Sequence, residues 1–222
     1  MSCVAVRPLL VWCERVYEQE NPSIDIVLDF GQKDAGLDRT QVLIEKIAAS
    51  GSADVFIAEH SKQFDALPGV KREERAWLVN RVVAVTARDS RLRMIDLSRG
   101  SCQVCVALER TPLGRLSRLA LDRRGIWSTV SDRVGRFDDS DAINEVVRHS
   151  SSRGQDVIGI VYASDATGAG VRVIGELELP DDESATHVAS WFTGEGERFA
   201  EFLWSDAVMA RASGMGLRPA PR

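Results

Sequence analysis

The sequence predicts an α+β fold in which helices pack on sheets built from antiparallel strand meanders, and three features lead to this expectation. Helical periodicity covers the first part of the chain, period-two alternation covers the middle, and strands followed by a helix return near the end. With 222 residues, of which 44% are hydrophobic and 27% charged, the chain is long enough to bury a substantial core.

The spacing of apolar residues predicts helices before residue 90. Pro8 suits the first position of the first helix, and Asp38 with Gln41 forms a capping box for the second, which Gly51 ends. Alternation of apolar and polar residues predicts a strand over 24–30. The three expected helices cover 8–19, 39–49 and 72–88.

From residue 91 the pattern favours strands with short connections, which is typical of an antiparallel meander. These strands are expected over 91–97, 102–109, 116–122 and 126–131, and a helix over 140–149 closes them. After a linker near 150–154, further elements are expected as strands over 156–163, 170–179 and 186–192 and a helix over 195–211. Two such blocks predict a pseudo-repeat in two halves, 1–149 and 150–222, sharing one core.

Composition and charge exclude several classes of protein. The net charge is −5 and both signs are mixed along the chain, so the sequence has no basic stripe of the kind that binds nucleic acid. No segment approaches the roughly 20 apolar residues of a membrane span. The expected location is therefore cytoplasmic, where Cys3, Cys13, Cys102 and Cys105 are reduced.

The sequence carries no motif that predicts catalysis, a metal or a cofactor. Cys102 and Cys105 form a lone CxxC pair without the further ligands that a zinc site needs, and on a strand their thiols lie on opposite faces. The histidines, His60, His149 and His187, are isolated from one another. We therefore expect no catalytic residues, no metal site and no cofactor, and a protein that is not an enzyme.

One segment favours an alternative, a nucleotide-binding enzyme. Asp29-Phe30-Gly31 after a strand resembles the first phosphate motif of the actin-like ATPase and sugar-kinase superfamily, and Asp165-Ala-Thr-Gly168 resembles a distant partner motif. The resemblance implies a carboxylate that holds Mg²⁺ beside a glycine turn that admits phosphate. Against it, residues 38–49 read as a helix where that superfamily has a hairpin. Whether this segment binds phosphate is left open.

The late aromatic residues suggest a surface for a partner protein. On the expected helix over 195–211, Phe199 and Phe202 lie on the inward face, whereas Trp204 and Val208 point away from it. A helix with two apolar faces is either buried on both sides or offers one to a partner. The candidate partner-binding residues are Trp204, Val208, Trp191 and Trp77.

The order of elements resembles the EspG-like chaperones of actinobacterial type VII secretion. The residues that carry this likeness are Trp12-Cys13, Pro22, Gly51, Trp77-Leu78, Ala87-Arg88 and Gly159–Tyr162. The resemblance implies a cytosolic, cofactor-free protein that grips the helical tip of a secreted partner. The chain is shorter than those chaperones and lacks a Gly-Arg pair that many of them carry, so no binding residue is transferred from the family.

The functional hypothesis is thus a non-enzymatic, chaperone-type protein that binds a protein partner. Its alternatives are the nucleotide-binding enzyme and a structural subunit of a larger assembly. The identity of the partner, the oligomeric state and the pathway do not follow from the sequence.

Overall fold

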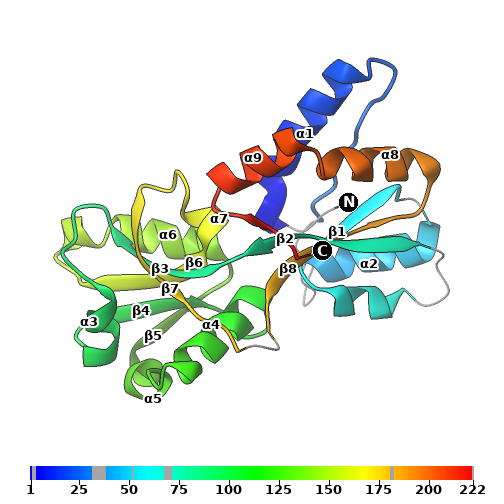
Figure 1. The fold of residues 1–222 in the computed structure, drawn as a ribbon. Coiled ribbons are helices and arrows are strands. Elements are labelled where there is room, and N and C mark those ends of the chain that lie inside the picture. Colours follow the sequence, from blue (N-terminus) through cyan, green and yellow to red (C-terminus); the bar gives the residue numbers. More distant parts are fainter. Residues whose placement is uncertain (2–3, 32–38, 52, 68–71, 181–182, 222) are drawn as a thin grey trace. The chain divides into compact units, whose positions relative to one another are not determined.

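The structure, a computed structural model, describes the chain apart from residues 2–3, 32–38, 52, 68–71, 181–182 and 222 (Figure 1). The chain forms two compact units, Met1–Val79 with Thr186–Arg222, and Asn80–Ala185. The backbone therefore passes from one unit to the other twice. Each unit has its own sheet.

The first unit contains a four-stranded sheet with the order β1-β8-β2-β9, in which β1 pairs with β8 and β2 with β9, both antiparallel. Its strands are β1 (Val55–Ala58), β2 (Glu73–Asn80), β8 (Ala185–Trp191) and β9 (Arg218–Pro219). Its helices are α1 (Arg7–Glu20), α2 (Arg39–Ser50), α8 (Gly194–Leu203) and α9 (Asp206–Gly214), with short 3-10 helices at Val4–Val6 and Ser61–Ala66.

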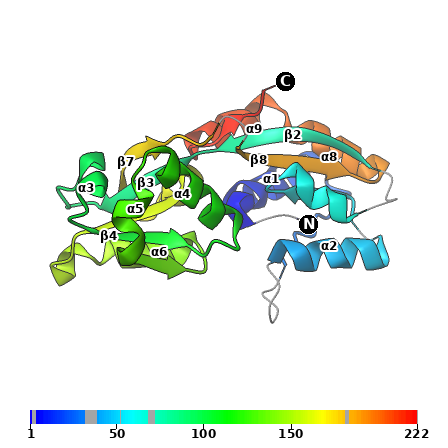
Figure 2. The ribbon, with the colours of Figure 1, turned by 90° about the horizontal axis from the view of Figure 1, so that it is seen from below.

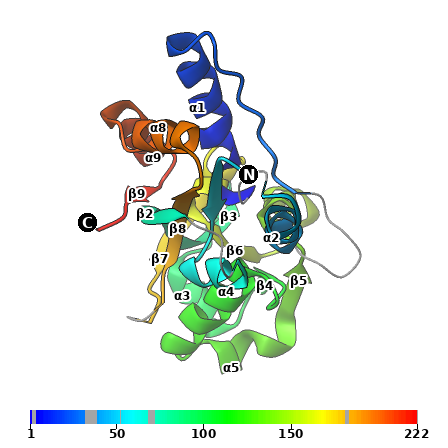
Figure 3. The same ribbon diagram turned by 90° about the vertical axis from the view of Figure 1, so that its right-hand side faces the viewer.

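The alternation of side chains along β1 gives this sheet two apolar cores. Val55 and Ile57 belong to the core formed with α1, α8 and α9, whereas Phe56 and Ala58 belong to the core formed with α2. The helix α2 accordingly lies on the opposite face of the sheet from α8 and α9 (Figure 2 and Figure 3). Trp77 on β2 is fully buried, and its indole Nε1 donates to the carbonyl oxygen of Leu203 at 2.8 Å.

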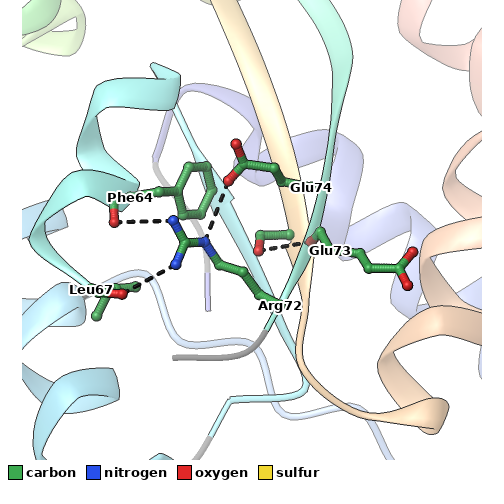
Figure 4. A network of polar contacts seen from close by, with 6 residues as sticks. Phe64, Leu67, Arg72, Glu73 and Glu74 are labelled. Carbon is green, nitrogen blue, oxygen red and sulfur yellow. Dashed lines mark hydrogen bonds and ion pairs between the residues drawn. The ribbon is translucent and has the colours of Figure 1, made fainter. Parts of the chain in front are cut away.

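Arg72 fixes the backbone just before β2 (Figure 4). Its guanidinium donates to the carbonyl oxygens of Leu67 at 3.1 Å and Phe64 at 3.2 Å, and its Nε contacts Glu74 at 3.3 Å. The same guanidinium lies over the Phe64 ring, with its Cζ 5.4 Å from the ring centroid. One side chain thus satisfies carbonyls at the end of the 3-10 helix Ser61–Ala66 and anchors β2 beside it.

The second unit contains a five-stranded mixed sheet with the order β5-β4-β6-β3-β7. Here β4 is parallel to β5 and β6, and β3 is antiparallel to β6 and β7. The strands are β3 (Val82–Ala87), β4 (Gln103–Ala107), β5 (Val134–Phe137), β6 (Val157–Tyr162) and β7 (Val171–Leu177). The helices are α3 (Met94–Arg99), α4 (Pro112–Arg123), α5 (Trp127–Val130), α6 (Ser140–Arg148) and α7 (Ala163–Ala166), with 3-10 helices at Ser131–Arg133 and Ser151–Arg153.

The helices α4 and α6 cover opposite faces of this sheet (Figure 1). Close packing of α6 depends on Gly159 in β6, because a Cβ atom there would lie 2.6 Å from Ile143 and 2.8 Å from Val147, both on α6. All six residues of β6 are buried, as expected for a central strand covered on both faces.

Several sequence predictions are confirmed. The structure has helices where they were expected at 8–19, 39–49 and 140–149, and strands where they were expected at 156–163, 170–179 and 186–192. Gly51 follows α2 with a φ of 60°. The chain has a mixed fold with helices packed on sheets. The proposed cap at Asp38 lies outside the described residues.

Other predictions are wrong. The segment 72–88, expected as a helix, forms β2 and β3. The six residues of β3 are all buried, and such a continuous apolar run fits a strand covered on both faces as well as it fits a helix. The segment 91–134, expected as a meander, contains α3, α4 and α5 around β4. Residues 24–30 form no regular strand, and the helix expected over 195–211 is divided into α8 and α9 at Trp204 and Ser205.

The two compact units also differ from the expected halves 1–149 and 150–222. The strand β6 pairs with β3 and β4, so the segment after residue 150 shares a sheet with the segment before it. A pseudo-repeat between the two expected halves stays a prediction.

Replacing Gly159 with alanine should destabilise the second unit. The added methyl would overlap Ile143 and Val147, and overpacking of this kind costs about 1–3 kcal/mol of unfolding free energy. Denaturant unfolding measures the change. Gly194→Ala is the matched control, since a Cβ atom at Gly194 meets nothing within 4 Å. An equal effect of both substitutions would contradict this packing.

His187 should make stability depend on pH. Burial on β8 lowers the pKa of His187 from 6.5 to about 4. Between these values the unfolded chain binds the proton and the folded chain does not, so lowering the pH costs stability, by at most about 1.4 kcal/mol for each pH unit. Asp165 has its pKa raised to about 6, so it acts in the opposite direction below that pH.

The variant His187→Gln isolates this contribution, because glutamine does not titrate. We expect wild type to lose unfolding free energy relative to the variant as the pH falls from 6.5 towards 4. Above that window the difference between the two proteins should be constant. Denaturant unfolding at a series of pH values measures it, and a difference that is constant across the whole range would refute the assignment.

Candidate functional site

The parallel strands of the second unit bring three chain segments to one edge. Because β5, β4 and β6 run in the same direction as neighbours, their carboxyl ends, at Phe137, Ala107 and Tyr162, lie at the same edge of the sheet. A helix begins within a few residues of each end: α6, α4 and α7. Ligands of open α/β sheets bind outside the carboxyl ends of the strands, especially where helices leave towards opposite faces.

The amino terminus of α4 is built by Thr111-Pro112. The Thr111 hydroxyl accepts from the N–H of Gly114 at 3.1 Å, and Pro112 occupies the first turn, where its missing N–H costs nothing. Gly114 is required because a Cβ atom there would lie 2.0 Å from the carbonyl oxygen of Leu108. Leu113 is the second residue of α4, so its N–H has no partner within the helix.

The amino terminus of α6 is built in the same way by Asp139. Its carboxylate accepts from the N–H of Ala142 at 3.0 Å. The preceding two N–H groups, of Ser140 and Asp141, have no recorded partner among the described residues. Such first-turn N–H groups have no partner within the helix, and together with the helix dipole they bind anions.

Two contacts join the loops that carry these helix termini. The N–H of Leu108 donates to the carbonyl oxygen of Phe137 at 2.8 Å. The guanidinium of Arg110 contacts the carboxylate of Asp138 at 3.1 Å. The loops that precede α4 and α6 are therefore bonded to each other, and they hold the amino termini of both helices.

A polar cluster supports the amino terminus of α6 from the side of β6. Asn80 donates to the Ser164 hydroxyl at 2.8 Å, and this hydroxyl donates to the Asp165 carboxylate at 3.1 Å. Ser140 contacts the same carboxylate, and Asn144 donates through Nδ2 to the carbonyl oxygen of Asp165 at 2.9 Å. The cluster therefore links α7 to the first turn of α6.

Within this cluster, Asp165 has a raised pKa. Burial raises the pKa of Asp165 to about 6, the hydroxyls of Ser140 and Ser164 oppose the increase, and the charges of Asp141 and Asp139 add to it. Asn144 is 4% exposed, and its Oδ1 has no hydrogen-bond partner in the structure.

This edge of the sheet is equipped to bind rather than to react. It offers main-chain N–H donors at the first turns of α4 and α6. No group of three or more His, Cys, Asp or Glu side chains among the described residues could hold a metal ion. The arrangement therefore suits a small anion that carries several acceptor oxygens.

The sequence reasoning found only part of this site. The helix expected over 140–149 begins where α6 begins, at Ser140. The same reasoning missed the start of α4, because residues 116–122 were read as a strand. Thr111-Pro112 was the available signal, since Thr caps helices and Pro occupies their first turn.

The four candidate partner-binding residues all lie in the first unit. Trp77 and Val208 are fully buried in its core. Trp191 and Trp204 are partly buried, and their rings meet edge to face with centroids 6.2 Å apart. Arg75 lies 4.9 Å from the centre of the Trp204 ring. A role of these residues in binding a partner protein stays a prediction.

The residues of the other hypotheses are engaged in local structure. Asp29 accepts from Lys46 at 2.8 Å and from the N–H of Gly31 at 2.9 Å, and the Lys46 hydrogen bond is the main cause that lowers its pKa. Burial raises the pKa of Cys102 to about 11 and that of Cys105 to about 12, so both remain thiols.

In the described residues no helix is long and apolar enough to span a membrane.

Comparison with known proteins identifies the family to which this architecture corresponds. Residues 4–218 match the profile of the family described as bacterial extracellular solute-binding protein. The molybdate-binding protein ModA of Haemophilus influenzae is 22% identical over 219 residues, which cover 90% of this chain and 81% of the relative.

Two solved structures have the same fold. A substrate-binding domain assigned to a molybdenum ABC transporter of Clostridium difficile gives a TM-score of 0.82 at 18% identity, with 99% of this chain and 97% of that chain covered. The periplasmic molybdate-binding protein of Azotobacter vinelandii gives a TM-score of 0.72 at 13% identity, with 100% and 98% covered.

These matches correct the functional predictions. The resemblance to EspG-like chaperones is wrong, since the match to another family covers nearly the whole chain. The predictions of a secreted protein partner and of a cytoplasmic location are wrong for the same reason. The nucleotide-binding enzyme and the structural subunit do not fit either. The prediction that the chain is not an enzyme is confirmed, because solute-binding proteins bind without catalysis.

Proposed function

Because the chain belongs to the family of bacterial extracellular solute-binding proteins, we propose that it binds a small tetrahedral oxyanion, with molybdate as the first candidate. The relatives named above are molybdate-binding proteins. Their ligand matches the donors found here in charge and in hydrogen-bonding character. We further propose that the chain acts outside the cytoplasm and delivers its ligand to an ABC transporter.

The observation that carries this proposal is the pair of helix amino termini at the carboxyl edge of the parallel strands. Thr111 and Asp139 satisfy the third N–H of each first turn and leave the N–H groups of Leu113, Ser140 and Asp141 for a ligand. Main-chain donors of this kind bind an anion without a paired cation, because the hydrogen bonds and the helix dipoles share its charge. An oxyanion with four oxygens can accept several such bonds at once.

Electrostatics of the surrounding side chains favour binding through hydrogen bonds over binding through charge. The positive side chain that precedes Thr111, Arg110, contacts Asp138 at 3.1 Å. Asp139 and Asp141 flank the first turn of α6. A neutral-donor site beside carboxylates discriminates by geometry, so we expect oxyanion size to set the selectivity.

Replacing Ser140 with proline tests the site directly. Proline is tolerated at the first helical position, so Ser140→Pro removes one donor N–H and should leave α6 intact. Loss of one hydrogen bond to a charged ligand costs about 1.5–3 kcal/mol, so we expect molybdate to bind about 10- to 100-fold more weakly. Isothermal titration calorimetry with sodium molybdate measures the dissociation constant.

Ser140→Ala is the matched control, because it removes the hydroxyl and keeps the N–H group. It should weaken binding by less than Ser140→Pro does, and circular dichroism should show that both variants are folded. Phosphate and sulfate as competitors then define the class of oxyanion. Unchanged molybdate affinity in a folded Ser140→Pro protein would refute the site.

A further inference from the structure

The polar cluster around Asp165 has features that binding through N–H groups alone does not require. It places the Asp165 carboxyl group beside Ser140, the first residue of α6, and the main-chain oxygen of Asp165 accepts from Asn144 in the body of the same helix. A carboxylate near an anion site opposes the binding of a second negative charge. The same carboxyl in its neutral form would not.

We propose that Asp165 is a positioning residue of this site that takes up one proton from the solvent when the oxyanion binds. This inference rests on the proposed function. Like charges close together raise the affinity of a carboxylate for protons, so a bound dianion at the amino terminus of α6 favours the neutral form of Asp165. By linkage, proton binding at Asp165 strengthens oxyanion binding by the same factor.

The free protein is already close to this protonation step. Burial, together with Asp141 and Asp139, raises the pKa of Asp165 to about 6, so a further increase on ligand binding crosses the neutral range. The hydroxyl of Ser164 and the side chain of Ser140 satisfy the ionised form. Both protonation states are therefore accommodated.

A neutral Asp165 needs an acceptor for its O–H group. The Oδ1 atom of Asn144 is buried and has no partner in the structure, and its Nδ2 already donates to the main chain of Asp165 at 2.9 Å. An unpaired buried oxygen of this kind is costly. The hydroxyl oxygens of Ser140 and Ser164 lie beside the Asp165 carboxyl and can accept from its O–H group when it is neutral.

Other charged side chains on the elements packed against α7 are engaged with different partners. Those elements are α6, β6, β3 and β7. The pairs are Arg81 with Glu176, Arg148 and His149 with Glu145, and Arg172 with the main-chain oxygens of Ser90 and Leu92. Tyr162 is the titratable residue of β6, and β3 carries none. Asp139 and Asp141 are thus the charges that act on Asp165, and both favour its protonation.

Calorimetric titration of the full chain with sodium molybdate in two buffers of different ionisation enthalpy measures the proton that is taken up. For wild type we expect net proton uptake and an affinity that falls about tenfold between about pH 5.5 and about pH 7.5. Asp165→Asn should take up no proton and bind with an affinity that does not change with pH. Asp132→Asn, at the amino end of β5, is the matched control and should behave as wild type.

A second variant keeps the inference testable if Asp165→Asn does not fold. Asp141→Asn removes one charge that favours protonation of Asp165, so the pH at which affinity falls should move down. Proton uptake that is equal in wild type and Asp165→Asn, or binding by wild type that is independent of pH, overturns the inference and leaves the proposed function intact. No binding of molybdate or other oxyanions at any pH overturns both.

Discussion

Parallel pairing of β4 with β5 and β6 is the constraint on which the site depends. Since the three strands run in one direction, the helices that follow them must begin at one edge of the sheet. An antiparallel meander would have sent alternate ends to opposite edges. Gly159 permits α6 to pack closely on β6, and Gly114 permits the first turn of α4 to approach Leu108. The N–H donors are therefore positioned by the backbone of the fold.

Placing donors on the main chain has a consequence for chemistry. N–H groups at a helix amino terminus stay neutral at every physiological pH and cannot act as a general base or a nucleophile. A protein with such a site binds its ligand and releases it unchanged, as expected for a solute-binding family. Asp165 lies in the polar cluster that supports the first turn of α6.

The sequence predicted local elements better than it predicted their arrangement. Pro8 and Gly51 are local signals, and the helices they delimit are present. The strand β3 is buried on both faces, so its apolar run cannot be told from that of a buried helix by periodicity. The helix α4 begins at Pro112, between the strands expected over 102–109 and 116–122, and it includes the second of these segments. Without a predicted helix at α4, the parallel connection from β4 and the candidate site at the start of α4 cannot be predicted.

The most direct test of the account follows backbone amides by NMR during titration with molybdate. The account predicts that the N–H resonances of Leu113, Ser140 and Asp141 change most within Asn80–Ala185, and that their hydrogen exchange slows, because each donates to the ligand. Saturation of the protein with molybdate while all three resonances stay in place would contradict it.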